Sequence, residues 1–309
     1  MSRFHRTVVA LGSLLAFAVP IFLTAAETVA TSVYGRVGNG YKREKLPDGT
    51  FKPEYYALSN GGRFMGTTAD NTVDRVAYPE VASIANRLLL QQNYRYAKTK
   101  EQAKLLIVLQ WGSTIAFNGV NNSNLVNQVA SSMAGADPQG MGSLEKTMSA
   151  VPSDGAAEDA LLALMVANRV RDQINEANAK VLGYLDDLND SNDIRRWAGG
   201  GDRYNDLIGD VEESRYYIVI SAYDFPELLK TEKKKLLWQT RVSVRTTGNR
   251  FDDSVMAMMK GASKYFGRDS GRLIRGEETK GTVEMGDIKF IGEAKEPGAL
   301  QTKPPEEKK

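Results

Sequence analysis

The side chains available for chemistry exclude most familiar active sites. The chain has no cysteine, and its single histidine, His5, lies in an N-terminal segment that we expect to be removed. Without an imidazole or a thiol, the mature chain has no Ser–His–Asp triad, no thiolate nucleophile, no disulfide and no ordinary zinc site. We therefore expect no catalytic residue, no metal site and no cofactor.

One spacing matches a known nucleophile pattern. Ser143-x-x-Lys146 is the pattern of penicillin-binding proteins, in which a lysine one helical turn away assists the deprotonation of the serine. The supporting motifs are missing, because residues 191–193 read Ser-Asn-Asp and residues 280–282 read Lys-Gly-Thr. We interpret Ser143 as a residue that caps the following turn.

Acidic residues offer two further patterns. Residues 187–193 alternate oxygen-bearing side chains like the start of a calcium loop, but Asn192 replaces the required glycine and Ala198 the required glutamate. Paired carboxylates can hydrolyse glycosides, which keeps a hydrolase of cell-wall or polysaccharide material as an alternative function. No spacing singles out a pair among the candidate acids, which are Asp224, Glu227, Asp252, Asp253 and Glu284.

A face with tyrosine and arginine side chains is the most suggestive surface. Residues 215–223 (RYYIVISAY) and 236–245 (LLWQTRVSVR) alternate like two strands that pair antiparallel. The alternation places Tyr217, Tyr223, Arg241 and Arg245 on one side, and Tyr and Arg are common interface anchors. We predict a ligand-binding or partner-binding face there; the alternative is that helices cover it, so that the tyrosines pack and the arginines pair with acids.

Hydrophobic periodicity predicts the elements that position this face. A helix is expected over 79–92 and another over 251–266, where Phe251, Val255, Met258, Met259, Ala262 and Tyr265 share one side. Residues 105–111 (LLIVLQW) are apolar on both faces and predict a central strand covered on both sides. Residues 55–59 predict an edge strand, and residues 281–291 a last strand.

A heptad pattern predicts one long helix over residues 156–188. Its seam consists of Ala160, Ala163, Ala167, Val170, Ile174, Ala177, Val181, Tyr184 and Leu188, the spacing of a coiled coil. The candidate interface residues are Val170, Ile174, Val181, Tyr184 and Leu188. Two interpretations stay open: the helix packs on short helices within residues 125–151, or it pairs with another chain.

Together these patterns predict an α+β fold. We expect a four- to five-stranded mixed, mostly antiparallel sheet with helices on one face, plus a largely helical insertion that carries the heptad helix. The predicted organisation is a signal peptide (1–26), a flexible segment (27–54), a discontinuous α+β domain (55–114 and 202–292), the helical insertion (115–201) and a disordered tail (293–309).

The N-terminus has the three parts of an export signal. Arg3 and Arg6 precede an apolar run over 7–23, and small residues at 24–26 supply a cleavage site. An uncleaved membrane anchor or a buried helix are the alternatives. Removing the two arginines from 40 basic residues leaves 38, equal to the 38 acidic residues. A neutral mature chain argues against a nucleic-acid partner, and we expect membrane contact only if the segment stays uncleaved.

The C-terminal block resembles known proteins. The runs SAYDFPELL, LLWQTRVSV, GNRF and ASKYFGRDSG resemble uncharacterised exported bacterial proteins that are grouped as domains of unknown function. The resemblance covers about residues 215–292, with 78–112 as a further region. It implies a periplasmic or secreted location and supplies no catalytic residues.

These observations favour an exported envelope protein without enzymatic activity. We expect it to act through protein–protein interaction or assembly, by self-association or with another envelope protein, through its helical insertion. A carboxylate-dependent hydrolase and a small-ligand-binding module are the alternatives.

Overall fold

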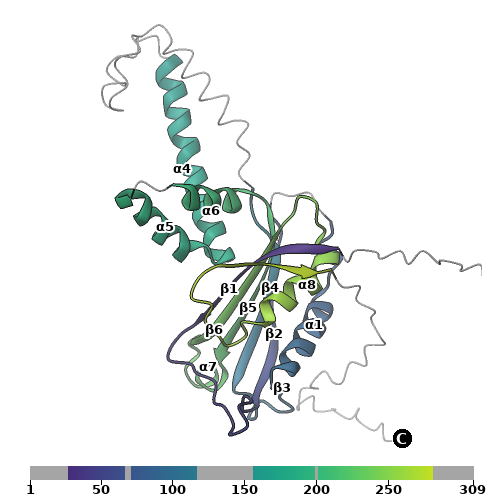
Figure 1. Ribbon diagram of the computed structural model, residues 1–309. Coiled ribbons are helices and arrows are strands. Elements are labelled where there is room, and N and C mark those ends of the chain that lie inside the picture. Colours follow the sequence, from purple (N-terminus) through teal and green to yellow (C-terminus); the bar gives the residue numbers. More distant parts are fainter. Residues whose placement is uncertain (1–26, 67–70, 117–155, 199–200, 281–309) are drawn as a thin grey trace, which may run out of the picture.

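A mixed β-sheet is the frame of the molecule (Figure 1). The computed structural model describes residues 27–66, 71–116, 156–198 and 201–280, and within these ranges the sheet has seven strands in the order β3-β2-β4-β5-β6-β1-β7. Strand β2 is parallel to β3 and β4, and all other neighbours are antiparallel. The strands are β1 (Thr28–Val37), β2 (Glu54–Phe64), β3 (Tyr94–Tyr96), β4 (Leu105–Ser113), β5 (Arg215–Asp224), β6 (Leu236–Arg245) and β7 (Ile274–Thr279).

Helices pack against both faces of this sheet. Helices α1 and α8 cover the first face, and α4, α5 and α6 cover one end of the second face (Figure 1). The described helices are α1 (Tyr78–Gln91), α4 (Ala156–Leu182), α5 (Leu185–Ala198), α6 (Asp202–Glu212), α7 (Phe225–Thr231) and α8 (Phe251–Ser263). The α+β class is thus confirmed, but the prediction of four or five strands with helices on one face is wrong.

The main core lies between the first face of the sheet and helices α1 and α8. The predicted helix 251–266 is α8, and five of its six predicted core residues are fully buried, whereas Tyr265 is partly buried. Trp238 of β6 lies in the same layer, with its ring 5.7 Å from that of Phe266 and 5.9 Å from that of Tyr94. Complete burial of such side chains supplies most of the stabilisation of a domain.

Strands β5 and β6 form the predicted antiparallel pair. Tyr216 lies opposite Val244 and Ile218 opposite Val242, so the apolar positions of both strands face the main core together. The other alternating set therefore points to the second face, as the sequence predicts. That set is the one that includes the candidate tyrosines and arginines.

The second face is only partly covered. Tyr34, Tyr217 and Val219 pack under α4, α5 and α6 in a smaller core. Further along the strands, Leu106, Val108 and Gln110 of β4 are only half-buried. The prediction that β4 is covered on both sides is wrong for this stretch, because the described helices reach only one end of the face.

The N-terminal segment is more ordered than its composition indicates. Residues 28–37, expected to belong to a flexible segment, form β1 between β6 and β7. Small and polar residues occupy positions where neighbouring strands bury them, as with Thr31 and Ser32. Local composition cannot show that burial, because it arises from partners more than 200 residues away.

Residues 38–53 are also fixed by contacts. The guanidinium of Arg43 lies between the rings of Phe51 and Tyr94, 4.2 and 4.0 Å from their centroids. The Tyr41 hydroxyl donates to Glu54 at 2.6 Å, and burial raises the pKa of this carboxyl. The cluster fastens the connection between β1 and β2 to β3, so the prediction of a flexible segment is wrong here as well.

Two other strands differ from expectation. Residues 55–59 belong to β2, and β3 pairs with the outer side of this strand only at 54–56, so residues 57–59 lie at an edge of the described sheet whereas residues 55–56 do not. The last described strand is β7 at 274–279, whereas the predicted strand 281–291 and the short helices expected within 125–151 lie outside the described residues.

The long helix expected over 156–188 is interrupted. Helix α4 ends at Leu182, and Gly183 takes a left-handed φ of +82° before α5 begins at Leu185. A Cβ at residue 183 would lie 2.7 Å from Cβ of Tyr34, so both conformation and space require glycine. The continuous coiled-coil seam is therefore not supported. No described helix is long and apolar enough to cross a membrane.

Candidate functional site

The structure brings the four predicted face residues to the second face of β5 and β6 but gives them different environments. Tyr217 is buried under the helices, and burial raises its pKa to about 12. Arg245 pairs with acids of the loop and helix before β5. Tyr223 lies beyond the helical layer, and Arg241 is half-buried between these two regions. The alternative interpretation is therefore correct for Tyr217 and Arg245.

Arg245 belongs to an ion cluster around one buried carboxylate. Asp210 of α6 accepts from Arg215 at 3.2 Å, Arg245 at 3.0 Å and Arg275 at 2.6 Å. The Tyr184 hydroxyl donates to the same carboxylate at 3.2 Å. Burial alone would raise the pKa of Asp210, but the three arginines outweigh burial and lower it. The cluster joins α6 to β5, β6 and β7, so we interpret it as a structural cluster that holds the helix on the sheet.

Arg215 is the buried partner in that cluster, with 2% of its surface exposed. It also donates to Ser243 at 3.1 Å and to Ser32 at 3.2 Å. These bonds satisfy a guanidinium that would otherwise be costly to bury.

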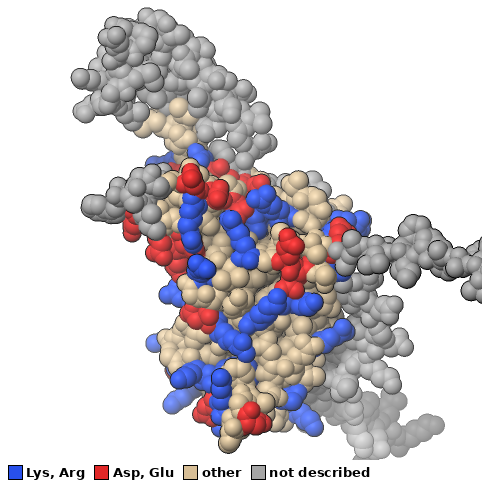
Figure 2. All heavy atoms as spheres, viewed as in Figure 1, with Lys and Arg blue, Asp and Glu red and all other residues tan. Residues whose placement is uncertain are grey.

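Elsewhere, charges of both signs are interspersed over the face of the molecule seen in Figure 2.

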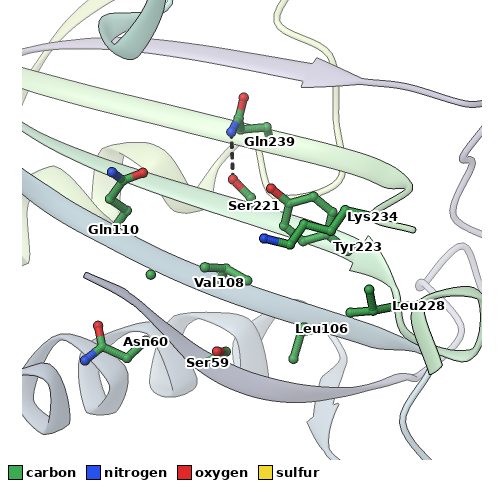
Figure 3. Close-up of a pocket in the computed structure, with 11 residues that line it drawn as sticks. Ser59, Asn60, Leu106, Val108, Gln110, Ser221, Tyr223, Leu228, Lys234 and Gln239 are labelled. Carbon is green, nitrogen blue, oxygen red and sulfur yellow. Dashed lines mark hydrogen bonds between the residues drawn. The ribbon is translucent and has the colours of Figure 1, made fainter. Parts of the chain in front are cut away.

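A groove occupies the uncovered part of the second face (Figure 3). Its volume is about 430 Å³, and its walls come from β2, β4, β5, β6, α7 and the turn before β6. The strand register sets this surface: Ser59 lies opposite Val108, Val108 opposite Ser221, and Ser221 opposite Gln239. The lining residues are Ser59, Asn60, Gly61, Leu106, Val108, Gln110, Ser221, Tyr223, Leu228, Lys234 and Gln239.

The groove is polar without being acidic. Gln239 donates to the Ser221 hydroxyl at 2.7 Å, as Figure 3 shows. The side chains of Ser59, Gln110 and Tyr223 have no hydrogen-bond partner among the described residues. No carboxylate is among the described residues that line the groove, so these residues do not supply the acid pair that glycoside hydrolysis needs.

Arg241 lies beside the groove on the same face of β6, two residues after Gln239. Its guanidinium is 6.0 Å from the ring centroid of Tyr34, and no described residue forms an ion pair with it. Burial lowers the pKa of Arg241, and the neighbouring Tyr34 offsets part of this decrease. Tyr34, Asp186 and Tyr223 favour the charged form of the arginine, but none of them forms a hydrogen bond or an ion pair with it, so its donors remain available to a ligand.

The candidate interface residues are divided between two helices. Tyr184 and Leu188 are buried, and Ile174 and Val181 are half-buried, whereas Val170 is 45% exposed. The buried side of α4 uses Asn175, Asn178, Ala179 and Leu182 instead of the predicted seam. Asn178 donates to the carbonyls of Ile115 and Val211. A search for apolar periodicity cannot detect a buried side that consists of polar residues.

The N-terminal half of α4 extends away from the sheet (Figure 1) and carries exposed apolar side chains. Leu162, Met165 and Val166 are 62%, 48% and 56% exposed, and Val170 continues the stripe. At 100° per residue, the stripe lies on the side opposite to the buried asparagines. The sequence pattern marked Val170 but missed the other three, because they fall outside the heptad seam.

The other sequence motifs form no active centre among the described residues. Asp224 caps α7 by accepting from the Glu227 amide at 3.0 Å, and Asp252 pairs with Arg250 at 2.8 Å. Asp187 accepts from the Leu273 amide at 2.7 Å, and the part of the chain that the structure describes holds no cluster of metal ligands. Ser143, Lys146 and Glu284 lie outside that part.

The groove residues other than Tyr223 were not predicted. Gln110 is the one polar residue within the apolar run LLIVLQW, and this signal was available in the sequence. No local sequence pattern marks Ser59, Lys234 and Gln239 as groove residues. They come together only because β2, β4, β5 and β6 pair in the sheet. No protein-family model matches the chain, and no curated protein matches it at a significant level.

Proposed function

We propose that this protein is an exported envelope protein that acts without catalysis, by association of two copies through α4. The observation that carries the proposal is the stripe of four large apolar side chains that α4 exposes. An exposed apolar helix face costs free energy in water and marks an interaction site in many soluble proteins.

The spacing of the stripe supports pairing with a second copy. Leu162, Val166 and Val170 are four residues apart, so they form one line along the helix. In an antiparallel pair with its two-fold axis at Val166, Leu162 of one copy meets Val170 of the other. Such self-complementarity is what a symmetric dimer requires.

The expected association is weak. A standard interface buries roughly 800 Å² per partner, and four partly exposed side chains supply only part of this area. The residues that precede α4 offer a second occupant, because the sequence predicts short helices within 125–151. Binding of that segment to the stripe would make the stripe internal, and the experiment below separates the two cases.

The test is the molar mass of residues 27–309, measured by light scattering over a concentration series. We expect a monomer–dimer equilibrium, and the double variant Val166→Lys, Val170→Lys should remain a folded monomer. Lysine is a good helix former, so the variant should keep its circular dichroism spectrum. The matched control, Leu90→Lys, Leu229→Lys, replaces two other exposed leucines and should dimerise like the wild type.

Two results would contradict the proposal. A wild type that stays monomeric at every concentration, with a variant that loses helix or stability, would mean that the stripe packs within the chain. A monomeric wild type with an equally stable variant would leave a different envelope protein as the partner of the stripe, and self-association would be wrong.

A small-ligand-binding module is the second candidate function. The specific observation that favours it is the polar groove on the open face of the sheet, with several unpartnered side chains. This groove is separate from the stripe on α4, so the two functions can be tested independently.

A further inference from the structure

Polar side chains of the groove point to a ligand with hydrogen-bonding groups. Ser59, Gln110 and Tyr223 project from three neighbouring strands and have no partner among the described residues. They are half-buried and remain accessible from the groove, so a ligand can replace their hydrogen bonds to water. Amide and hydroxyl groups both donate and accept, which suits a ligand that is rich in hydroxyl groups.

The charged groups of the groove are cationic. Lys234 is the only charged residue among the described residues that line it, and Arg241 follows about 7 Å beyond Gln239 along β6. Neither forms an ion pair with a described residue. The nearby acids are already engaged: Asp186 with Arg36 at 3.7 Å, and Asp224 with Lys235 at 3.7 Å. Among the described residues, the groove therefore offers a ligand one cation in its lining, Lys234, and a second beside it, Arg241, but no free carboxylate.

The floor of the groove over β4, β5 and β6 has no free backbone edge to which an extended peptide could pair. Peptides that add to a sheet pair with a free edge, whereas this groove lies on the face of β2, β4, β5 and β6. Strands β4, β5 and β6 are each paired on both sides, so their backbone groups are occupied, whereas β3 pairs with β2 only at 54–56. Over β4, β5 and β6 only side chains are available for recognition, and the floor between them is aliphatic, formed by Leu106 and Val108.

We propose that the groove binds an anionic saccharide, a chain of sugar rings that carries carboxylate groups. The amide of Gln110 and the hydroxyls of Ser59 and Tyr223 bond the sugar hydroxyls, and the aliphatic floor contacts the C–H surface of a ring. Lys234 and Arg241 pair with the carboxylates. Arginine is suited to this task because its planar fork matches a carboxylate.

Calorimetric titration of residues 27–309 tests this proposal with three probes. Trigalacturonate carries both hydroxyls and carboxylates, the uncharged trisaccharide of galactose lacks the carboxylates, and citrate lacks the sugar. We expect trigalacturonate to bind at least about tenfold more tightly than either of the others, the scale of a charge-assisted hydrogen bond.

Neighbouring lysines provide a matched pair of variants. Lys234→Met removes the groove cation and should weaken trigalacturonate binding about tenfold, whereas Lys233→Met, outside the groove lining, should change it less than about twofold. Arg241→Gln should weaken binding by a similar factor. Both lysines are exposed in the turn before β6, so neither change should affect folding.

Four outcomes would overturn the proposal. They are no measurable binding of trigalacturonate by the wild type, equal binding of the uncharged trisaccharide, equal binding of citrate, and a Lys234→Met variant that binds as well as Lys233→Met. The α4 variant Val166→Lys, Val170→Lys should bind trigalacturonate normally, so that failure of the association proposal does not affect this test.

Discussion

Replacing Asp210 with asparagine should destabilise the fold strongly. The substitution keeps the size of the side chain but removes the only carboxylate among the described residues that lies within bonding distance of Arg215, which is 2% exposed. Ser32 and Ser243 still accept from the guanidinium, but neither carries a charge. The variant therefore leaves a buried cation without a counterion.

The expected loss follows from this uncompensated charge. Breaking a buried ion pair by removing one partner costs roughly 3–5 kcal/mol. The ion pairs of Asp210 with Arg245 and Arg275 add little to this loss of stability, because both arginine side chains are more than half exposed and water screens their charges. A domain with a total stability of about 5–15 kcal/mol would lose a large share of it.

Urea unfolding, followed by tryptophan fluorescence and circular dichroism, measures the effect. The matched control is Asp206→Asn, one helical turn earlier on α6, where the carboxylate is exposed. We expect the control to stay within about 0.5 kcal/mol of the wild type, as for most surface substitutions. If Asp210→Asn were equally harmless, the argument that Arg215 depends on this carboxylate would be refuted.

The pH dependence gives the same prediction a second test. The arginines lower the pKa of Asp210 in the folded state, so its contribution to stability is complete above the unfolded-state value of about 3.9. It is lost as the pH falls through the lower folded-state pKa. Below about pH 4 the wild type should therefore lose stability more steeply than Asp210→Asn, and parallel profiles would contradict this assignment.

Two further substitutions test how α4 is held. Gly183→Ala should cost about 2–4 kcal/mol in urea unfolding, because alanine disfavours the left-handed backbone and its Cβ would collide with Tyr34. Asn178→Leu should cost about 2–4 kcal/mol, because the buried carbonyls of Ile115 and Val211 would lose their donor.

Controls for both lie on α6. Gly209→Ala has open space at its Cβ position and should stabilise or leave the protein unchanged, and Asn205→Leu is exposed and should have little effect. If Gly183→Ala matched Gly209→Ala in stability, the steric requirement at the α4–α5 junction would be wrong. Equal stability of Asn178→Leu and Asn205→Leu would show that the buried amide does not hold α4.

Local periodicity predicted the elements whose burial follows a simple rule. Helices α1 and α8 and strands β4, β5 and β6 were all recognised, because their apolar residues recur at helical or strand spacing. Strand β1 was missed since its buried residues include Thr31 and Ser32, whose burial depends on β6 and β7. The break at Gly183 was missed because a heptad pattern can continue across a change of helix.

The candidate sites show the same division. Alternation in β5 and β6 correctly placed the tyrosines and arginines on one face, but it did not show which part of that face the helices cover. Tyr217 is buried by packing and Arg245 forms ion pairs, whereas Tyr223 lines the groove. The other groove residues come from segments up to 180 residues apart in the sequence.

The sequence by itself determined the α+β class, the antiparallel pairing of β5 with β6 and the absence of cysteine chemistry. Each of these depends on residue type or on spacing within one short segment. The tertiary structure alone decided the seven-strand order, the side of α4 that is buried and the position of the groove. These features depend on which distant segments become neighbours in the fold. Strand register and polar packing select those neighbours, and local periodicity does not encode either of them.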